Sequence, residues 1–322
     1  MSSEPPAAKR QRTENAPEVT RSETWRDDGN VVLQAGNVQF RAHWSVLALH
    51  SSVFSDMRGL PQPPDQPTVE GCPVIELFDD SADVEYLLKA LYIPSFHCKK
   101  VLPLPVIGAL LRLGRKYDIK YLFDSAVARL TSEFPATLQE LDIAMSSNRK
   151  VENIRGYATM TSCNLIFDII TLAHENQIFT VLPLAYYLAA VYKPRALFEI
   201  NDNDEGNPRL PPIHLRRCIS GRESLITKQL LPSYVFGWVT KWEFKDCTTV
   251  AACRHFRESF LTACLQERAL LALNAEWTAA RLCQNCSGHA EKLISAGREK
   301  IWNELPEIFD LPPWNELKNG DL

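Results

Sequence analysis

The sequence predicts an α+β fold: a small sheet clustered with α-helices in the first third, followed by an all-helical remainder. Residues 29–60 combine two short strands and a tight turn with two short helices that follow at once. Apolar residues then recur at helical spacing along 84–91 and 104–117. The second half contains more apolar helical stretches and no repeat of fixed period, which argues against propeller and ankyrin arrays.

The hairpin is the most informative segment. Residues 31–33 form an apolar strand, and a turn at 35–37 (Ala-Gly-Asn) leads into a strand at 38–42, in which apolar and polar residues alternate. Apolar residues within 46–57 predict the helical pair. A hairpin followed directly by a compact helical pair favours a protein-interaction module over an active site.

A proline-rich loop and a capped helix come next. Pro61–Pro73 contains five prolines and returns to a strand at 74–77. Asp80 or Ser81 is placed to cap the following helix. The apolar stripe of that helix consists of Val84, Leu87, Leu88 and Leu91.

Two further helices are predicted at 104–117 and 122–130, and Pro135 marks a boundary. We therefore divide the chain into four parts, which are a tail, a first domain, a helical extension and a C-terminal helical domain, at residues 1–22, 23–134, 135–200 and 201–322.

The tail lacks periodicity and is rich in Ser, Pro, Glu, Ala and Arg, so we expect it to be disordered. It contains a short basic cluster, Lys9, Arg10 and Arg12. This cluster is either a nuclear import signal or an ordinary solvated run of charge.

Composition limits the classes of function. The net charge of -4 creates no strong field for nucleic acid or membranes, and 13 glycines argue against phosphate-binding loops. The N-terminus shows no secretory signal, and the longest apolar run, near 181–192, is too short to span a bilayer. We expect an intracellular protein, nuclear or cytoplasmic, without nucleic-acid or membrane partners.

The cysteines are the most chemical feature of the second half. Cys283 and Cys286 form a CxxC pair, Cys247 and Cys253 lie upstream, and His289 follows three residues later. Four thiolates could hold a structural Zn²⁺, and we expect no other cofactor. Alternatively, Cys283 and Cys286 are buried thiols on one helix face. Redox chemistry is disfavoured because no βαβ pattern surrounds the pair.

The segment Trp302–Trp314 mixes bulky apolar residues with prolines. This mixture predicts an ordered strap rather than a helix, packed against the helix before it. A short linear motif that docks on a partner is the alternative.

Motifs of enzymes are absent from the sequence. It contains no GxSxG, Walker loop, GxGxxG or HExxH. The segment that begins at His174 starts like HExxH but lacks the second histidine. His43 has no nucleophile or carboxylate beside it in a hydrolase pattern, so we interpret it as a structural residue. We therefore expect a protein that is not an enzyme.

Residues 25–134 resemble a BTB/POZ domain. The resemblance rests on Gly29–Leu33, on Phe40–His43, on Ser45–Met57 and on the Leu110–Tyr117 helix. The rest of the chain is similar to a fungal, chiefly basidiomycete, family of BTB proteins. These share the proline-rich loop, the stretch at 111–118 and a tail like Trp302–Leu317.

This resemblance implies homodimerisation and recruitment of partner proteins. In some branches of the family the partner is a cullin scaffold for ubiquitin ligation, and in others a transcriptional corepressor, so the alternatives are a ligase adaptor and a nuclear regulatory scaffold. The implied pocket and interface residues are Asn30, His43, Trp44, Met57 and Leu60.

Two departures from the family pattern are visible. The family commonly has an acidic and a basic residue where this chain has Asn30 and Trp44, so the pocket loses both charges together and is reshaped. The hydrophobic-x-Glu motif of cullin-recruiting members has no clean equivalent within Pro61–Pro73, which makes cullin binding the less favoured interpretation.

Overall fold

The computed structural model describes residues 18–61, 65–99, 101–146, 154–155, 163–201, 210–241, 245–268, 270–273 and 281–322. It divides the chain into two compact units. The first contains the described residues up to Cys98 together with Leu113–Lys120, and the second contains Lys99–Arg112 and the residues from Tyr121 onward. Each unit is described by itself.

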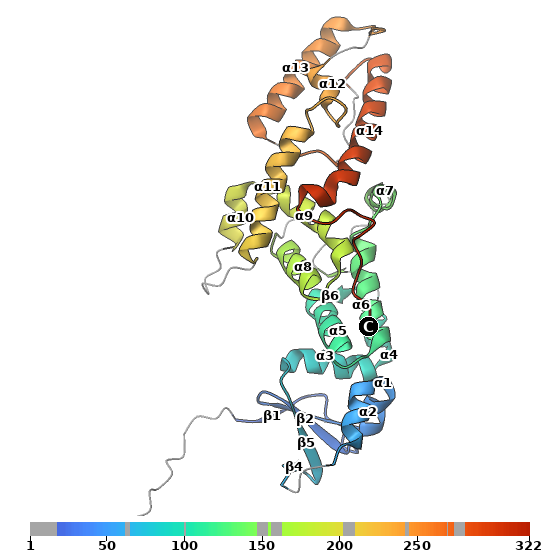
Figure 1. Ribbon diagram of the computed structural model, residues 1–322, viewed down its shortest axis with the longest axis vertical. Coiled ribbons are helices and arrows are strands. Elements are labelled where there is room, and N and C mark those ends of the chain that lie inside the picture. Colours follow the sequence, from blue (N-terminus) through green and yellow to red (C-terminus); the bar gives the residue numbers. More distant parts are fainter. Residues whose placement is uncertain are drawn as a thin grey trace, which may run out of the picture. The chain divides into compact units, whose positions relative to one another are not determined.

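The first unit is built on a five-stranded sheet in the order β1-β3-β2-β5-β4 (Figure 1). The strands are β1 Thr20–Arg21, β2 Val31–Ala35, β3 Val38–Ala42, β4 Thr68–Val69 and β5 Cys72–Leu77. The central β2 pairs antiparallel with β3 and parallel with β5. The two-residue strands β1 and β4 form the edges. The expected hairpin is confirmed, and it lies at the centre of the sheet.

The two edge strands lie where we expected none. β1 falls within the predicted tail, and the backbone N–H groups of Ser22 and Arg26 extend its pairing to the carbonyls of Gln39 and Arg41 at 2.9 and 3.0 Å. β4 falls within the predicted loop at Pro61–Pro73 and forms a tight hairpin with β5.

The hairpin between β4 and β5 depends on two left-handed residues. Glu70 has φ 52° and Gly71 has φ 77°. Positive φ at both central residues is the geometry of the two-residue turn that matches the twist of paired strands. The prolines around this turn hid its signal in the sequence.

Four helices complete most of the first unit: α1 Trp44–His50, α2 Ser52–Gly59, α3 Ser81–Tyr92 and α4 Pro94–His97. Asp80 caps α3 as predicted, because its carboxylate accepts the N–H groups of Ala82 and Asp83 at 2.9 and 3.3 Å. The apolar stripe of α3 is buried throughout, and α1 and α2 lie beside the sheet (Figure 1).

Residues 113–120 are fastened to this unit through Tyr117. Its ring stacks on Phe54 with centroids 4.5 Å apart, and its carbonyl accepts the hydroxyl of Ser51 at 2.5 Å. Its own hydroxyl donates to Asp79, which also pairs with Lys116 at 2.7 Å. Burial, reinforced by Asp79, raises the pKa of Tyr117, so the phenol keeps its proton.

The second unit is helical, as predicted. Its helices, with α5 continuing into the first unit, are α5 Leu104–Lys116, α6 Lys120–Glu133, α7 Leu138–Ser146, α8 Cys163–Glu175, α9 Leu182–Ala190, α10 Pro194–Asn201, α11 Pro212–Lys228, α12 Gly237–Thr240, α13 Val250–Glu267 and α14 Gln284–Ile308. A 3₁₀ turn at Phe179–Val181 precedes α9, and short strands β6 Leu102–Pro103 and β7 Ile154–Arg155 pair in parallel.

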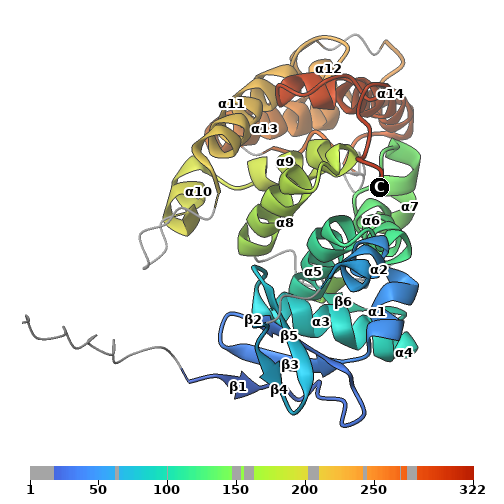
Figure 2. The same cartoon turned by 60° about the horizontal axis from the view of Figure 1, so that its bottom comes forward.

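Helix α9 forms the core of this unit. It is buried on almost every side and packs against α8, α11 and α14 (Figure 2). A helix that is apolar all round has no wet face, and this explains why its sequence shows a continuous apolar run rather than a stripe.

The C-terminal segment departs from our prediction. Helix α14 continues through Trp302 to Ile308 and includes Pro306, so the first half of the expected strap is helical. Pro306 has no N–H to donate to the carbonyl of Trp302, four residues earlier. The indole N–H of Trp314 donates to that carbonyl instead, at 2.8 Å, and the two tryptophan rings stack 5.3 Å apart. The later chain replaces the bond that proline removes.

The remaining tail residues do form a strap on the second unit. Phe309 is fully buried against Gly221 of α11. Asn319 accepts the N–H and the hydroxyl of Thr180 at 3.1 and 3.0 Å, and Gly320 donates to the carbonyl of Gln177 at 2.8 Å. Hydrogen bonds from Asn319 and Gly320 to residues 177–180 therefore hold the end of the tail on the second unit.

Residues 1–17 lie outside the described residues, and with them the basic cluster Lys9, Arg10 and Arg12. Across the part of the chain that the structure describes, no helix is both long enough and apolar enough to cross a membrane.

Candidate functional site

Asn30 and Trp44, two residues of the expected pocket, are in direct contact. The side-chain oxygen of Asn30 accepts the backbone N–H of Trp44, the first residue of α1, at 2.8 Å. His43 occupies the N-cap of α1 and, within the described residues, makes no capping bond with its side chain. Asn30, which directly precedes β2, therefore accepts one of the N–H groups that have no partner within the first turn of α1. Trp44 is buried, whereas Asn30 is exposed.

His43, which directly follows β3, makes contacts through both ring nitrogens. Its Nδ1 lies 3.1 Å from the hydroxyl of Tyr92, and its Nε2 lies 3.1 Å from Asp28. Its backbone N–H also donates to that hydroxyl, at 2.8 Å. The Tyr92 hydroxyl thus contacts both the backbone and the ring of His43. These contacts support the structural interpretation of His43.

Met57 and Leu60 lie near the end of α2. Met57 is half-buried, whereas Leu60 is 63% exposed. Two other large apolar side chains of this unit are even more exposed and were missed by our sequence reasoning: Leu49 at 78% and Phe78 at 91%. Phe78 directly follows the buried Leu77 of β5, so alternation along the strand pointed it outward. An aromatic residue at an outward position was the signal that could have found it.

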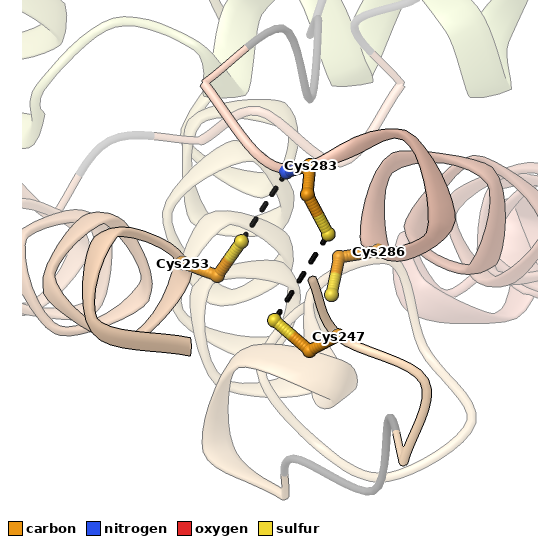
Figure 3. A group of neighbouring side chains, drawn as sticks. All are labelled: Cys247, Cys253, Cys283 and Cys286. Carbon is orange, nitrogen blue, oxygen red and sulfur yellow. Dashed lines mark hydrogen bonds between the residues drawn. The ribbon is translucent and has the colours of Figure 1, made fainter. Parts of the chain in front are cut away.

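The four cysteines of the second half converge, although they come from three segments. Their sulfur atoms all lie within 4.8 Å of one another, and the sulfurs of Cys247 and Cys283 are 3.9 Å apart. Figure 3 shows the four side chains turned toward a common centre. Cys253 and Cys286 are buried, and Cys247 and Cys283 are half-buried.

Two helix starts build this cluster. Cys253 lies in the first turn of α13, Cys283 is the N-cap of α14, and Cys286 is the third residue of α14. Cys247 comes from the loop before α13. Helix starts carry unpaired N–H groups and a partial positive charge, which stabilise thiolates.

Backbone N–H groups are aimed at the sulfurs. The N–H of Cys283 donates to Cys253 at 3.2 Å, and that of Cys286 donates to Cys283. Cys247 accepts the N–H of Thr249. The Thr248 side chain and the N–H groups of Cys286 and Thr248 lower the pKa of Cys283 to about 5, while burial raises the pKa of Cys286. One thiol of the group therefore loses its proton first.

His289 lies outside the sulfur cluster. Its Nε2 lies 3.1 Å from both carboxylate oxygens of Asp246, and this contact lowers the pKa of Asp246. The side-chain amide of Asn285 donates to the Asp246 carbonyl at 2.8 Å. Both contacts fix the loop that carries Cys247 to the start of α14.

Comparison with known families identifies the N-terminal part. Residues 23–133 match the BTB/POZ domain family, as the sequence motifs predicted. A search of curated proteins found no match to the chain. The matched residues include the hairpin, the helical pair, Asn30 and His43, and also α5 and α6. Modules of this family bind other proteins, so the first third of the chain is a protein-interaction module.

Proposed function

We propose, from the BTB/POZ domain at residues 23–133, that this chain is a non-enzymatic adaptor which forms a homodimer through that domain and recruits partner proteins. The observation that carries the proposal is the family match. Exposed Leu49, Leu60 and Phe78 support it, because covering each side chain fully would contribute roughly 1.5–3 kcal/mol.

Dimerisation is tested by light scattering and sedimentation velocity on the full chain at micromolar concentrations. We expect the mass of two chains. A monomer at every concentration would contradict homodimerisation and leave the recruitment of other partners to be tested separately.

Recruitment is tested with a pair of matched substitutions. Leu60 is 63% exposed in the first unit and Leu265 is 62% exposed on α13 in the second. Leu60→Lys should reduce capture of partners from a lysate of the source cells, measured by quantitative mass spectrometry, whereas Leu265→Lys should leave the same partners bound. Equal behaviour of the two variants would remove Leu60 from the proposed surface.

A cullin-scaffold adaptor is the second candidate, favoured by the exposure of Leu60 beside the proline-rich loop. Glu70 counts against it, because its carboxylate is paired with Arg21 and Arg41 at 2.6 and 2.9 Å and lies in the β4–β5 turn. The test is direct titration with a purified cullin from the source organism. Saturable binding that Met57→Ala and Leu60→Lys weaken would favour this candidate, and absence of binding would remove it.

Nuclear regulation is the remaining candidate. It rests on the basic cluster at residues 9–12 and on the corepressor-binding branches of the BTB family. Replacing Lys9, Arg10 and Arg12 by alanine in a fluorescent fusion should shift the protein from nucleus to cytoplasm. Unchanged distribution would end this interpretation. The similarity of 111–118 and of the tail to fungal, chiefly basidiomycete, BTB proteins makes a fungal cell the natural host for the assay.

A further inference from the structure

We propose that Cys247, Cys253, Cys283 and Cys286 bind one Zn²⁺ as a structural centre of the helical unit. The proposal depends on the geometry of the second unit alone and stands whether or not the BTB domain dimerises.

The spacing of the sulfurs is the first argument. A tetrahedral site with zinc–sulfur bonds of about 2.3 Å places its sulfurs about 3.8 Å apart. The sulfurs of Cys247 and Cys283 are 3.9 Å apart, and all four sulfurs lie within 4.8 Å of one another. Thiols buried merely as small apolar groups need only fill space. They have no reason to converge from one loop and the starts of two helices.

The surroundings of the sulfurs are the second argument. Neutral thiols are weak hydrogen-bond acceptors, yet three of the sulfurs receive backbone N–H groups. Four thiolates around Zn²⁺ carry a net charge of -2. The N–H groups and the two helix starts supply positive potential at the place where that charge would lie.

The donor set indicates which metal fits and what it does. Tetrahedral thiolate sites select Zn²⁺ or iron over hard cations such as Mg²⁺. With four protein ligands, no coordination position is left for water or substrate, so the centre is structural and not catalytic. His289 is not needed as a ligand, because it is paired with Asp246.

The centre would join parts of the chain that are distant in sequence. Cys253 and Cys283 are 30 positions apart, at the starts of α13 and α14. A bond network through zinc would hold these starts and the Cys247 loop together, and the free energy of binding would become free energy of folding. Removing zinc should therefore lower the unfolding temperature of the second unit.

The first test measures metal in the purified full chain. The chain is prepared under reducing conditions, reconstituted with Zn²⁺, desalted and analysed for zinc and protein. We expect one zinc ion per chain. Replacement by Co²⁺ should give the intense visible and sulfur-to-metal charge-transfer bands of a tetrahedral thiolate site. Failure to retain zinc or cobalt after reconstitution would overturn the proposal, as would a disulfide among these four cysteines in the reduced preparation.

The second test uses matched cysteine variants. Cys253→Ser and Cys286→Ser should each abolish stoichiometric zinc. Cys264→Ser is the control, because Cys264 is buried on the same helix as Cys253 and lies outside the cluster. Equal loss of zinc in the control, or full retention in Cys253→Ser, would contradict the site. If a ligand variant fails to fold, the cobalt spectrum of the unaltered chain still decides the question.

Discussion

The indole N–H of Trp314 compensates for the hydrogen bond that Pro306 removes from α14. A substitution that deletes this N–H tests the compensation. Trp314→Phe keeps an aromatic ring to stack on Trp302 but removes the N–H that donates to the Trp302 carbonyl. Because Pro306 cannot donate to that carbonyl, the substitution leaves a carbonyl of a buried residue without its bond.

The size of the effect follows from the cost of an unpaired buried group. An unsatisfied carbonyl costs about 1–3 kcal/mol, and the smaller ring loses some stacking in addition. The loss of stacking can be measured separately in a Pro306→Ala background. There the restored N–H of residue 306 can donate to the Trp302 carbonyl as in any helix, so Trp314→Phe loses mainly the stacking.

The assay is a double-mutant cycle on the full chain, measured by urea unfolding and followed by far-ultraviolet circular dichroism. We expect a coupling free energy of about 1–2 kcal/mol between Pro306 and Trp314. Equal costs of Trp314→Phe in the two backgrounds, within about 0.3 kcal/mol, would refute the reasoning.

Four further predictions concern stability. Asp80→Ala removes the cap of α3 and should lower the free energy of unfolding of the first unit by about 1 kcal/mol in urea unfolding. In α14, Gly288→Ala should raise stability by up to about 1 kcal/mol because the added carbon meets open space. Gly297→Ala should lower it by about 1–2 kcal/mol, because the same carbon would collide with the backbone of Val235, and a stable Gly297→Ala variant would contradict that packing. Burial, followed by nearby positive groups, lowers the pKa of the buried His214 to about 4, so the unfolded state binds its proton first as pH falls. Stability should therefore drop by up to about 3 kcal/mol between pH 6.5 and 4, and His214→Gln should flatten that part of the pH profile.

Local patterns explain the elements that the sequence predicted well. The stripe on α3 and the carboxylate of Asp80 lie within one helix, so spacing alone reveals them. The β2–β3 hairpin likewise depends on neighbours in sequence. Strand β1 has only two residues and no pattern of its own, so it was assigned to the tail. It exists because β3 offers carbonyls to pair with.

Contacts between distant residues explain the elements that the sequence could not predict. Pro306 on its own predicts that the helix ends before it. The helix continues because Trp314, eight positions later, donates to the carbonyl that the proline leaves unpaired. Similarly, the spacing of the four cysteines left zinc, buried thiols and redox chemistry open, because spacing does not say whether α13 and α14 begin side by side. Phe78 was overlooked although its position after Leu77 pointed it outward, because one exposed aromatic does not by itself identify a contact surface.

The short edge strands have a consequence for how this module can assemble. At one edge of the sheet the chain from β1 to Arg26 pairs with β3, and at the other edge β4 and the carbonyl of Pro67 pair with residues 72–74 of β5. Both edge strands have only two residues, and edges this short are poor templates for a further strand, which disfavours growth of the sheet from molecule to molecule. A contact between copies at these edges would therefore depend on side chains more than on backbone pairing.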